Sequence, residues 1–252
     1  MIELGGRMAV VTGGGSGLGA VMARRLVGHG VRVVLVGRRY DAVAAVAAEL
    51  GELARPEACD VSSPDDVAEL GSRLAGDDVS ILVNNAGIGG PVAALQDITP
   101  EEWDEVFAIN VRGTYLMCRA LLPAMYERGA GDVVNVASVS GKRPLARRTP
   151  YCASKMAVIG LTTTLAHEAG PHGVRVNTLS PGPVESERMD RNFRLEAERT
   201  GTTVDEARRA FVERAALGRM VTPDEVADAL VAMLAMPGLT GSDVDLSGGM
   251  IA

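Results

Sequence analysis

The sequence predicts an α/β fold: a doubly wound, Rossmann-like parallel sheet with helices on both faces, in a single domain over residues 1–252. Two observations predict this class. Short valine-rich segments alternate with longer segments of helical spacing along the whole chain. The valine-rich segments are also apolar throughout, which is typical of parallel strands that are buried on both faces.

The predicted strands are short apolar runs that end at a glycine or at a polar residue. They are expected around residues 7–12, 31–37, 57–59, 81–84, 132–138, 174–180 and 243–246. Aromatic residues make up only 3% of the chain. We therefore expect Val, Leu, Ala and Ile to fill the core between the strands and the helices.

The predicted helices have recognisable boundaries. The first covers 17–30 and ends at a glycine, and the second is the alanine-rich segment 40–51. Three later helices begin where a hydroxyl residue precedes proline and acids, in "SPDD" (63–66), "TPEE" (99–102) and "TPDE" (222–225). The last two predict capping boxes. The charged stretch 185–211 breaks the alternation; we expect an exposed helical pair there, and a substrate lid over 185–215.

Composition excludes several classes of protein. The formal net charge of −7 argues against a surface that binds nucleic acid. Three cysteines without paired spacing suggest neither a disulfide framework nor a metal site. No stretch approaches the ~18 uninterrupted apolar residues of a membrane span, and the first residues lack the apolar run of a signal peptide. We therefore expect a cytoplasmic protein without nucleic-acid or membrane partners and without a bound metal.

A glycine-rich segment, "TGGGSGLGA" (12–20), follows the first predicted strand and opens the first helix. Such a loop lets the backbone approach a pyrophosphate and directs helix N-terminal amides at its charge. The glycine spacing alone fits an ordinary turn equally well, but the placement between strand and helix favours a dinucleotide. The predicted contacts in this loop are Gly13, Ser16, Gly17, Leu18 and Gly19.

The tip of the second predicted strand meets the adenosine ribose in a dinucleotide fold. An acid there accepts hydrogen bonds from the 2′-hydroxyl of NAD(H), whereas an arginine pairs with the 2′-phosphate of NADP(H). This chain has Arg38 and Arg39 at the tip and no carboxylate. We therefore predict NADP(H) as the preferred cofactor, with Arg38 as the closer contact and NAD(H) as the alternative. Solvated surface charge is the other interpretation of the two arginines.

Several further motifs follow the glycine loop in a fixed order. They are "DV" at 60–61, "NNAG" at 84–87, Asn110, Ser138, Tyr151-x-x-x-Lys155 and "SPGPV" at 180–184. With these motifs in register, the chain resembles the short-chain dehydrogenases/reductases in their compact single-domain form. The resemblance spans nearly the whole length.

The resemblance implies the other cofactor contacts. Asp60 would hydrogen-bond the adenine amino group, and Val61 would pack beside the ring. The remaining implied contacts are a wall beneath the ribose and nicotinamide side, Asn84, Ala86 and Gly87, and a nicotinamide lining, Pro181, Gly182 and Val184.

Tyr151 and Lys155 stand four residues apart, which places both side chains on one helical face. A phenol on its own titrates near pH ~10, too high for a base at neutral pH. An ammonium ~5 Å away, in an effective dielectric of about 20, favours the phenolate by roughly 3 kcal/mol. The pair can therefore form a proton-transfer group that a lone tyrosine could not.

The resemblance also implies the roles of the catalytic residues. Lys155 would hold the nicotinamide ribose, and Asn110 would hold a water that connects this lysine to solvent. Ser138 would hydrogen-bond the substrate oxygen. In the reductive direction, hydride goes to the carbonyl carbon while Tyr151 protonates the oxygen.

A basic segment, "GKRPLARRTP" (141–150), joins the predicted serine strand to the tyrosine helix. One or two of its cations would attract an anionic substrate, or else the segment is a solvated loop or an oligomer contact. Both interpretations stay open on the sequence alone.

Taken together, these features predict a ketoreductase-like oxidoreductase that interconverts a secondary alcohol and a ketone by hydride transfer. Two alternatives remain: an NAD(H)-dependent alcohol dehydrogenase that runs oxidatively, and a non-catalytic regulatory protein that binds the cofactor. The expected partner is a small carbonyl or alcohol substrate. The resemblance implies a homo-oligomer, a dimer or tetramer, built through the helices after Thr99 and Tyr151 and through the C-terminal segment 245–252.

Overall fold

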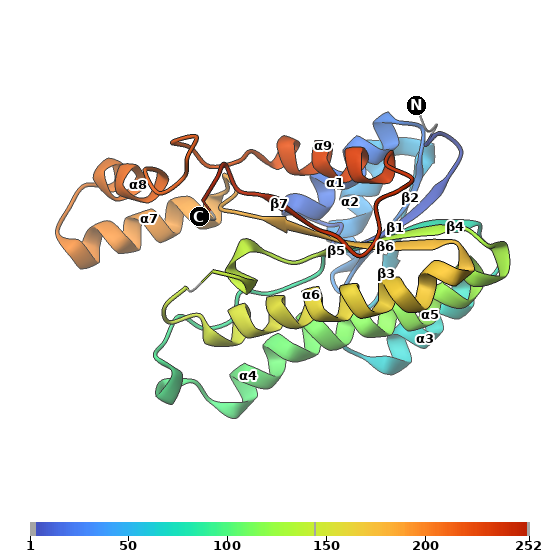
Figure 1. The fold of residues 1–252 in the computed structure, drawn as a ribbon, viewed down its shortest axis with the longest axis horizontal. Coiled ribbons are helices and arrows are strands. Elements are labelled where there is room, and N and C mark those ends of the chain that lie inside the picture. Colours follow the sequence, from blue (N-terminus) through green and yellow to red (C-terminus); the bar gives the residue numbers. More distant parts are fainter. Residues whose placement is uncertain (1–3, 144, 251–252) are drawn as a thin grey trace.

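The computed structural model describes residues 4–143 and 145–250, with residue 188 as backbone only. Within this part of the chain, seven strands form one parallel sheet in the order β3-β2-β1-β4-β5-β6-β7 (Figure 1). The strands are β1 (Met8–Thr12), β2 (Arg32–Gly37), β3 (Ala54–Ala58), β4 (Val79–Asn84), β5 (Gly131–Val136), β6 (Val174–Pro181) and β7 (Asp243–Leu246). The order reverses between β1 and β4, and ligands of such sheets bind outside the carboxyl ends at this point.

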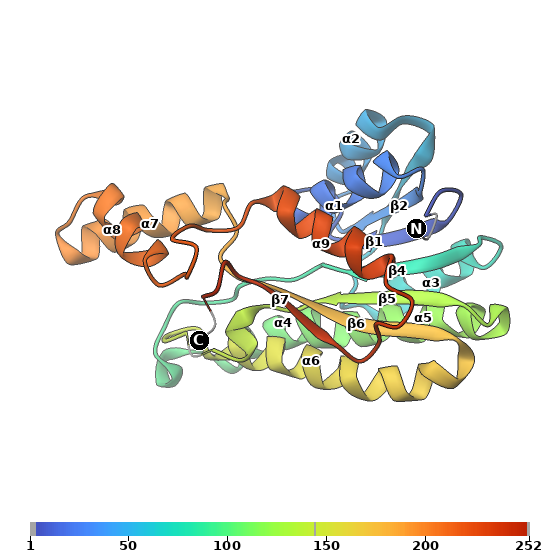
Figure 2. The ribbon, with the colours of Figure 1, turned by 45° about the horizontal axis from the view of Figure 1, so that its top comes forward.

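Helices cover both faces of the sheet (Figures 1 and 2). On one face lie α1 (Gly17–Gly28), α2 (Tyr40–Leu50) and α9 (Pro223–Leu234). On the other lie α3 (Pro64–Leu74), α4 (Pro100–Phe107), α5 (Gly113–Arg128) and α6 (Thr149–Ala169). Each interface has its own apolar core, whose buried members among the described residues are aliphatic or sulfur-containing. The predicted fold class is confirmed.

The three helix starts predicted from N-cap residues are confirmed, because the N-cap side chains make the expected hydrogen bonds. Ser63 accepts a hydrogen bond from the Asp66 backbone at the start of α3. Thr99 and Thr222 form complete capping boxes with the glutamates three residues on. These bonds satisfy N–H groups that have no partner inside the helix, which is why the pattern is readable from the sequence.

The strand boundaries differ from the predicted ranges by up to three residues; β4, for example, begins at Val79 and not at 81. β3 begins at Ala54 and ends at Ala58, whereas the sequence predicted 57–59. It is an edge strand with half-buried Arg55, Pro56 and Glu57, so it lacks the apolar run by which the inner strands are recognised. β5 ends at Val136, two residues earlier than predicted, and Ser138 instead begins the 3₁₀ turn Val139–Gly141.

The helical pair predicted after β6 is confirmed. α7 (Glu187–Thr200) and α8 (Val204–Val212) project beyond the carboxyl end of the sheet (Figure 1). The rings of Phe193 and Phe211 meet edge to face with 5.4 Å between centroids, so they join the two helices. Thr203 and Glu206 form a further capping box at the start of α8, in addition to the predicted ones.

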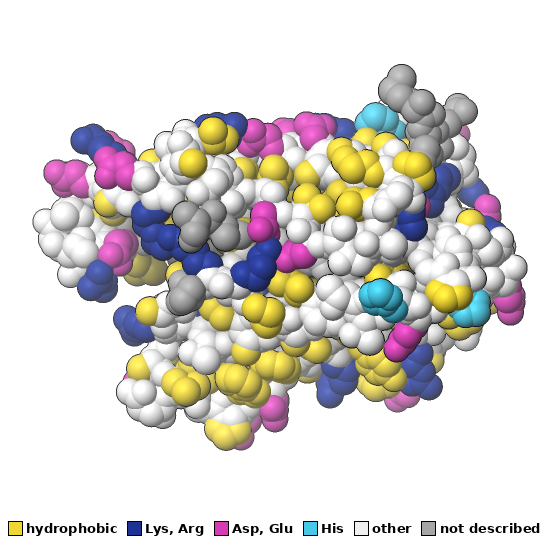
Figure 3. All heavy atoms as spheres, in the orientation of Figure 1, with side chains coloured by type: hydrophobic (Ala, Val, Ile, Leu, Met, Phe, Trp, Pro, Cys, Tyr) yellow, Lys and Arg dark blue, Asp and Glu magenta, His cyan; other side chains and the backbone are white. Residues whose placement is uncertain are grey.

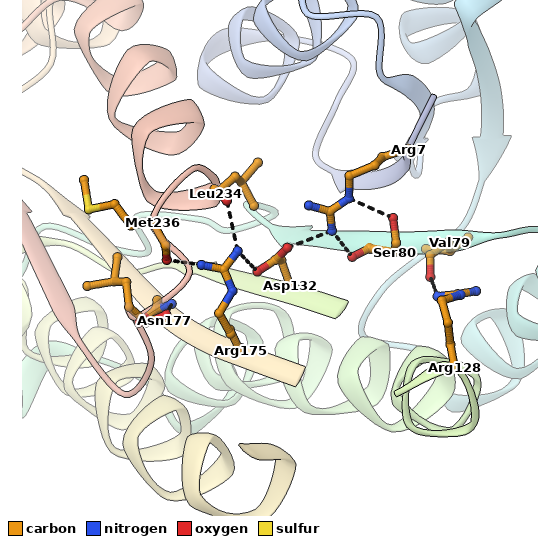
Figure 4. Close-up of polar contacts among 10 residues, drawn as sticks. Arg7, Val79, Ser80, Arg128, Asp132, Arg175, Asn177, Leu234 and Met236 are labelled. Carbon is orange, nitrogen blue, oxygen red and sulfur yellow. Dashed lines mark hydrogen bonds and ion pairs between the residues drawn. The ribbon is translucent and has the colours of Figure 1, made fainter. Parts of the chain in front are cut away.

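The opposite, amino-terminal edge of the sheet is closed by an ion triad (Figure 4). Asp132, at the start of β5, lies 2.7 Å from Arg7 and 2.6 Å from Arg175. Its side chain is only 8% exposed. Both arginines also donate to backbone carbonyls, of Ser80 and of Leu234 and Met236. The triad therefore links the starts of β1, β4, β5 and β6 to the end of α9.

None of the helices that the described residues form has the length and apolar character needed to cross a bilayer.

Candidate active site

The four residues predicted to be catalytic lie at the carboxyl edge of the sheet. Ser138 follows β5, and Tyr151 and Lys155 lie in the first two turns of α6. Asn110 lies in a π-helical turn, Ala108–Arg112, between α4 and α5. The ideal Cβ position of Gly87, just past β4, is 3.1 Å from Asn110 Oδ1 and 3.5 Å from Lys155 Nζ. The fold thus brings the end of β4, the π-turn and α6 into contact.

The Ser138 hydroxyl is held by two hydrogen bonds. Its Oγ accepts from the Ser140 backbone N–H at 3.1 Å and donates to the Pro181 carbonyl at 3.4 Å. The first bond starts the 3₁₀ turn, and the second joins the end of β5 to the end of β6. Ser138 is buried. Its hydroxyl therefore has a fixed place between two strand ends.

Lys155 and Tyr151 form the pair that their spacing predicted. Lys155 Nζ lies 5.8 Å from the centroid of the Tyr151 ring. The lysine is 6% exposed and donates to the Val136 carbonyl at 2.8 Å, which ties it to the end of β5. Because the ammonium is buried, water screens its charge only weakly. The fold therefore holds a buried positive charge beside the Tyr151 ring.

Asn110 anchors the loop that follows β4. Its Nδ2 donates to the Ile88 carbonyl at 3.0 Å and to Ser154 Oγ at 2.9 Å, and its Oδ1 accepts from the Ile88 N–H at 2.8 Å. These bonds occupy the amide of a residue that is 1% exposed. The water relay implied for Asn110 stays a prediction, whereas its structural link between the π-turn, the β4 loop and α6 is direct. No pattern in the sequence predicts that Ser154 takes part in this link.

The glycine loop forms a closely packed cradle between β1 and α1. Gly13 and Gly17 have φ of +67° and +53°, values that favour glycine. A Cβ on Gly19 would lie 2.2 Å from the Gly13 carbonyl oxygen, so position 19 has no room for a side chain. No described atom lies within 4 Å of an ideal Cβ on Gly17, so bare backbone faces outward at the start of α1. Ser16, the N-cap residue of α1, makes no capping bond within the described chain, and Leu18 follows in the first turn.

Two residues of the quoted motifs, for which the sequence predicts no role, hold this cradle against β4. Thr12 Oγ1 accepts from the backbone N–H groups of Asn85 and Ala86, both at 3.0 Å. Asn85 Nδ2 donates to the Thr12 carbonyl at 2.9 Å. Both lie inside the quoted motifs, but only the fold shows that one motif binds the other. These hydrogen bonds join the ends of β1 and β4 at the switch point of the sheet.

The predicted adenosine end lies at the tips of β2 and β3. Arg38 is exposed, and its Nη1 lies 3.9 Å from Asp60 Oδ2. Asp60 Oδ1 accepts from the backbone and hydroxyl of Ser62, at 2.9 and 2.7 Å. Val61 is buried against Gly113, whose ideal Cβ would lie 2.8 Å from Val61 Cγ2. The Val61 side chain thus packs at the start of α5, and its contact with adenine stays a prediction.

The Asn84 side chain takes part in a buried polar chain. Its Nδ2 donates to Asn135 Oδ1 at 2.9 Å and to Cys118 Sγ at 3.3 Å. Asn135 in turn donates to Thr162 Oγ1 at 2.9 Å. The chain links β4 and β5 to α6, so the side chain of Asn84 has a structural role besides the implied contact with the ribose.

The predicted nicotinamide lining lies where β6 ends. The Gly182 backbone donates to the Leu246 carbonyl at 2.7 Å, and an ideal Cβ on Gly182 would lie 2.7 Å from Ser247. Val184 forms an isolated bridge with Val221. Pro181, the last residue of β6, accepts the Ser138 bond. These contacts place the segment 181–184 next to Ser138, between the sheet and the helices α7 and α8.

Comparison with known proteins settles the family. The family model described as short chain dehydrogenase matches residues 7–197. The chain belongs to the short-chain dehydrogenase family. It is accordingly an NAD(P)-dependent enzyme that acts on CH–OH groups.

Individual relatives of this dehydrogenase align over almost the whole chain. D-threitol dehydrogenase of Mycolicibacterium smegmatis is 35% identical, covering 98% of this chain and 94% of the relative. A solved NAD⁺-bound xylitol dehydrogenase superposes with a TM-score of 0.91 at 28% identity, covering 98% of this chain and 100% of that one. An actinorhodin polyketide ketoreductase solved with NADPH has a TM-score of 0.90 at 32% identity, with 99% of both chains covered.

The basic segment of the dehydrogenase is largely committed to other contacts. Lys142 pairs with Asp243 at 2.6 Å and with Asp245, both on β7. Arg147 donates to the Val92 carbonyl at 3.3 Å, and Arg148 donates to the Gly89 carbonyl at 2.9 Å. These cations therefore tie the segment to β7 and to the loop after β4. Recognition of an anionic substrate by the segment stays a prediction.

The surface of the protein has a recess near the carboxyl ends of the strands. Figure 3 shows it between the lobe that carries α7 and α8 and the lobe that carries α4. Among the described residues, no group of three or more His, Cys, Asp or Glu side chains could hold a metal ion. All three cysteines are free thiols.

Proposed function

We propose that this nicotinamide-dependent oxidoreductase interconverts a secondary alcohol and a ketone through Ser138, Tyr151 and Lys155, with NADP(H) preferred. The observation that carries the proposal is the buried Lys155 ammonium, which lies 5.8 Å from the Tyr151 ring and is tied to the strand that leads to Ser138. The glycine cradle fits a dinucleotide, because bare backbone at the start of α1 faces outward while position 19 is closed to side chains.

The bound cofactor would supply a hydride to the carbonyl carbon or accept one from the alcohol. In reduction, Tyr151 donates its proton to the substrate oxygen, and Ser138 donates a hydrogen bond to the same oxygen. In oxidation, the Tyr151 phenolate takes the hydroxyl proton. The charge of Lys155 would favour the phenolate in both directions, and the lysine would also bind the ribose next to the nicotinamide.

A variant of Tyr151 tests this mechanism. Tyr151→Phe removes the proton and keeps the ring, so kcat should fall by roughly 10²–10⁴-fold, while the cofactor Kd stays within about threefold. Turnover is followed by nicotinamide absorbance on a panel of ketones and alcohols, and binding by cofactor fluorescence. Retained turnover would refute the mechanism. Intact cofactor binding without any turnover by the wild type would support the non-catalytic alternative.

The cradle has its own test in α1. Gly19→Ala places a Cβ 2.2 Å from a backbone oxygen, so cofactor binding and stability should both fall. Gly28→Ala, at the other end of the same helix, meets no described atom within 4 Å. This control should keep cofactor affinity and be neutral or stabilising by up to ~1 kcal/mol. Equal cofactor affinity in the two variants would argue against the cradle.

The preference for NADP(H) rests on Arg38. It is exposed at the tip of β2, and the next residue in the chain, Arg39, lines a depression of about 330 Å³ together with Tyr40, Asp41 and Ala42. Loss of a charge-assisted hydrogen bond costs ~1.5–3 kcal/mol. Arg38→Ala should therefore weaken NADPH binding by about 10–100-fold and leave NADH binding unchanged, with Arg39→Ala affecting NADPH less. Tighter NADH than NADPH binding by the wild type would favour the oxidative NAD(H)-dependent alternative.

Three further proposals follow from the same assignment. Residues 185–215 act as the substrate lid, because α7 and α8 project beside the strand ends that carry the site. The protein is a cytoplasmic homo-oligomer, a dimer or tetramer, which sedimentation would test. The last two residues of the implied C-terminal contact, 251–252, lie outside the described residues.

A further inference from the structure

Arg148 stands at an electrostatically unfavourable place. It is the N-cap residue of α6, a position that usually holds Ser, Thr, Asp or Asn, and its side chain makes no capping bond. The positive end of the helix dipole also disfavours a cation there. A residue that breaks both rules is expected to have a compensating contact elsewhere.

The contacts of the Arg148 side chain are with the candidate active site. The Arg148 guanidinium carbon lies 5.4 Å from the centroid of the Tyr151 ring, slightly closer than Lys155 Nζ at 5.8 Å. Its Nη2 donates to the Gly89 carbonyl at 2.9 Å, which anchors the guanidinium between the ring and the loop after β4. Arg148 is half-buried, so water screens its charge only in part.

We propose that Arg148 is a positioning residue that acts through Tyr151, as a second cation that favours the phenolate and fixes the ring. This inference rests on the proposed function, since it assumes that Tyr151 carries the proton. Two cations within 6 Å of one ring centroid stabilise its anion more than Lys155 alone.

Other charged groups lie on the elements packed against this end of α6. Lys142, after the 3₁₀ turn, is paired with Asp243 and Asp245, and Arg112 of the π-turn donates to the Ser62 carbonyl. The neighbouring α4 carries the carboxylates Glu101, Glu102, Asp104 and Glu105. The positive charge of Lys142 is therefore compensated by two aspartates, and the Glu102 carboxylate accepts from the Thr99 backbone N–H in the α4 capping box.

Arg147 provides a matched control. It is the neighbouring residue, also an arginine, and its Nη2 likewise donates to a carbonyl of the loop after β4, that of Val92. Within the described contacts, its guanidinium does not lie over the Tyr151 ring. Loss of either arginine removes one tie to the loop, whereas only loss of Arg148 removes a charge from the phenol.

The direct test is the ultraviolet titration of the phenolate, with the Tyr151→Phe spectrum subtracted to isolate this tyrosine. Arg148→Met should raise the midpoint pH of Tyr151 ionisation by about one unit, Arg148→Lys should restore much of the shift, and Arg147→Met should leave the midpoint in place. This readout requires no turnover. A midpoint in Arg148→Met equal to that of the wild type would overturn the proposal.

The kinetic test separates charge from structure. Below the midpoint, kcat/KM for alcohol oxidation should be about tenfold lower in Arg148→Met, and the deficit should close at high pH, where the phenolate forms in both proteins. A deficit that persists at every pH would mean a purely structural role and would refute the proposal. If the midpoint shifts but no alcohol or ketone is turned over, the proposed function fails and the charge effect stands.

Discussion

The amino-terminal ion triad permits a stability prediction whose magnitude follows from burial. In Asp132→Asn, the carboxylate that bridges Arg7 and Arg175 at 2.7 and 2.6 Å is lost while the side-chain volume is kept. Removal of one partner from a buried ion pair costs ~3–5 kcal/mol. The arginine side chains are 22% and 18% exposed and keep carbonyl acceptors, so the loss should lie near the lower limit, about 3 kcal/mol.

The same molecule offers an exposed pair of equal length as the control. Arg128 and Asp78 lie 2.6 Å apart, but the Asp78 side chain is 64% exposed. Surface pairs contribute a median of ~0–1 kcal/mol. Asp78→Asn should therefore lower the free energy of unfolding by less than ~1 kcal/mol. Because the ion-pair distances are equal, a difference in the free energy of unfolding between the two variants measures the effect of burial.

Urea unfolding gives the free energy of unfolding of both variants, and thermal unfolding gives their Tm, with circular dichroism as the readout of each. A loss of ~3 kcal/mol lowers Tm by about 6–12 °C in a domain of this size, and the Asp78 variant should stay within about 3 °C. Equal effects in the two variants would refute the argument that burial decides the contribution of the triad.

Two further predictions concern protonation and thiol chemistry. Hydrogen bonds from Arg219, and then from the Thr222 backbone, lower the pKa of Glu225 to about 2. The stabilisation by this carboxylate should be present above pH ~4.3, the ordinary value for glutamate, and be lost as pH falls to about 2. The stability gap to Glu225→Gln should close over that window, and a gap independent of pH would contradict the assignment. Burial raises the pKa of Cys59 to about 11 and that of Cys118 to about 12, so alkylation of the native protein at pH ~8 should label mainly the half-buried Cys152, as peptide mapping would show. Rapid labelling of either deep thiol would contradict the burial.

Much of the site could be predicted because its residues carry local signals. The glycine loop, the capping boxes and the spacing of Tyr151 and Lys155 are each contained in a few consecutive residues, and their geometry follows from helix and turn rules. The polar edge strand β3 was only partly identified because it lacks the apolar run of a buried strand. The hydrogen bonds between Thr12 and Asn85 could not be predicted from the sequence, because they join motifs that are 73 residues apart.

The contacts of the basic segment (141–150) also could not be predicted from the sequence. On the sequence it is four cations near an active-site mouth, and either substrate recognition or solvation fits. The structure separates the cations: Lys142 binds β7, Arg147 and Arg148 bind carbonyls, and Arg148 also lies over the Tyr151 ring. Partner choice by a long cationic side chain depends on which acceptors the fold brings within reach, and no local pattern encodes it.

The amino-acid sequence by itself determined the fold class, the order of the elements and the placement of Tyr151 and Lys155 on one helical face, because hydrophobic periodicity and short-range spacing act within one or two turns of chain. Only the tertiary structure decided which distant groups meet: Lys155 with the end of β5, Asn110 with the loop after β4, and Asp132 with two arginines from other strands. Burial and charge pairing arise when the sheet closes, since they depend on contacts between segments whose separation along the chain carries no local signal.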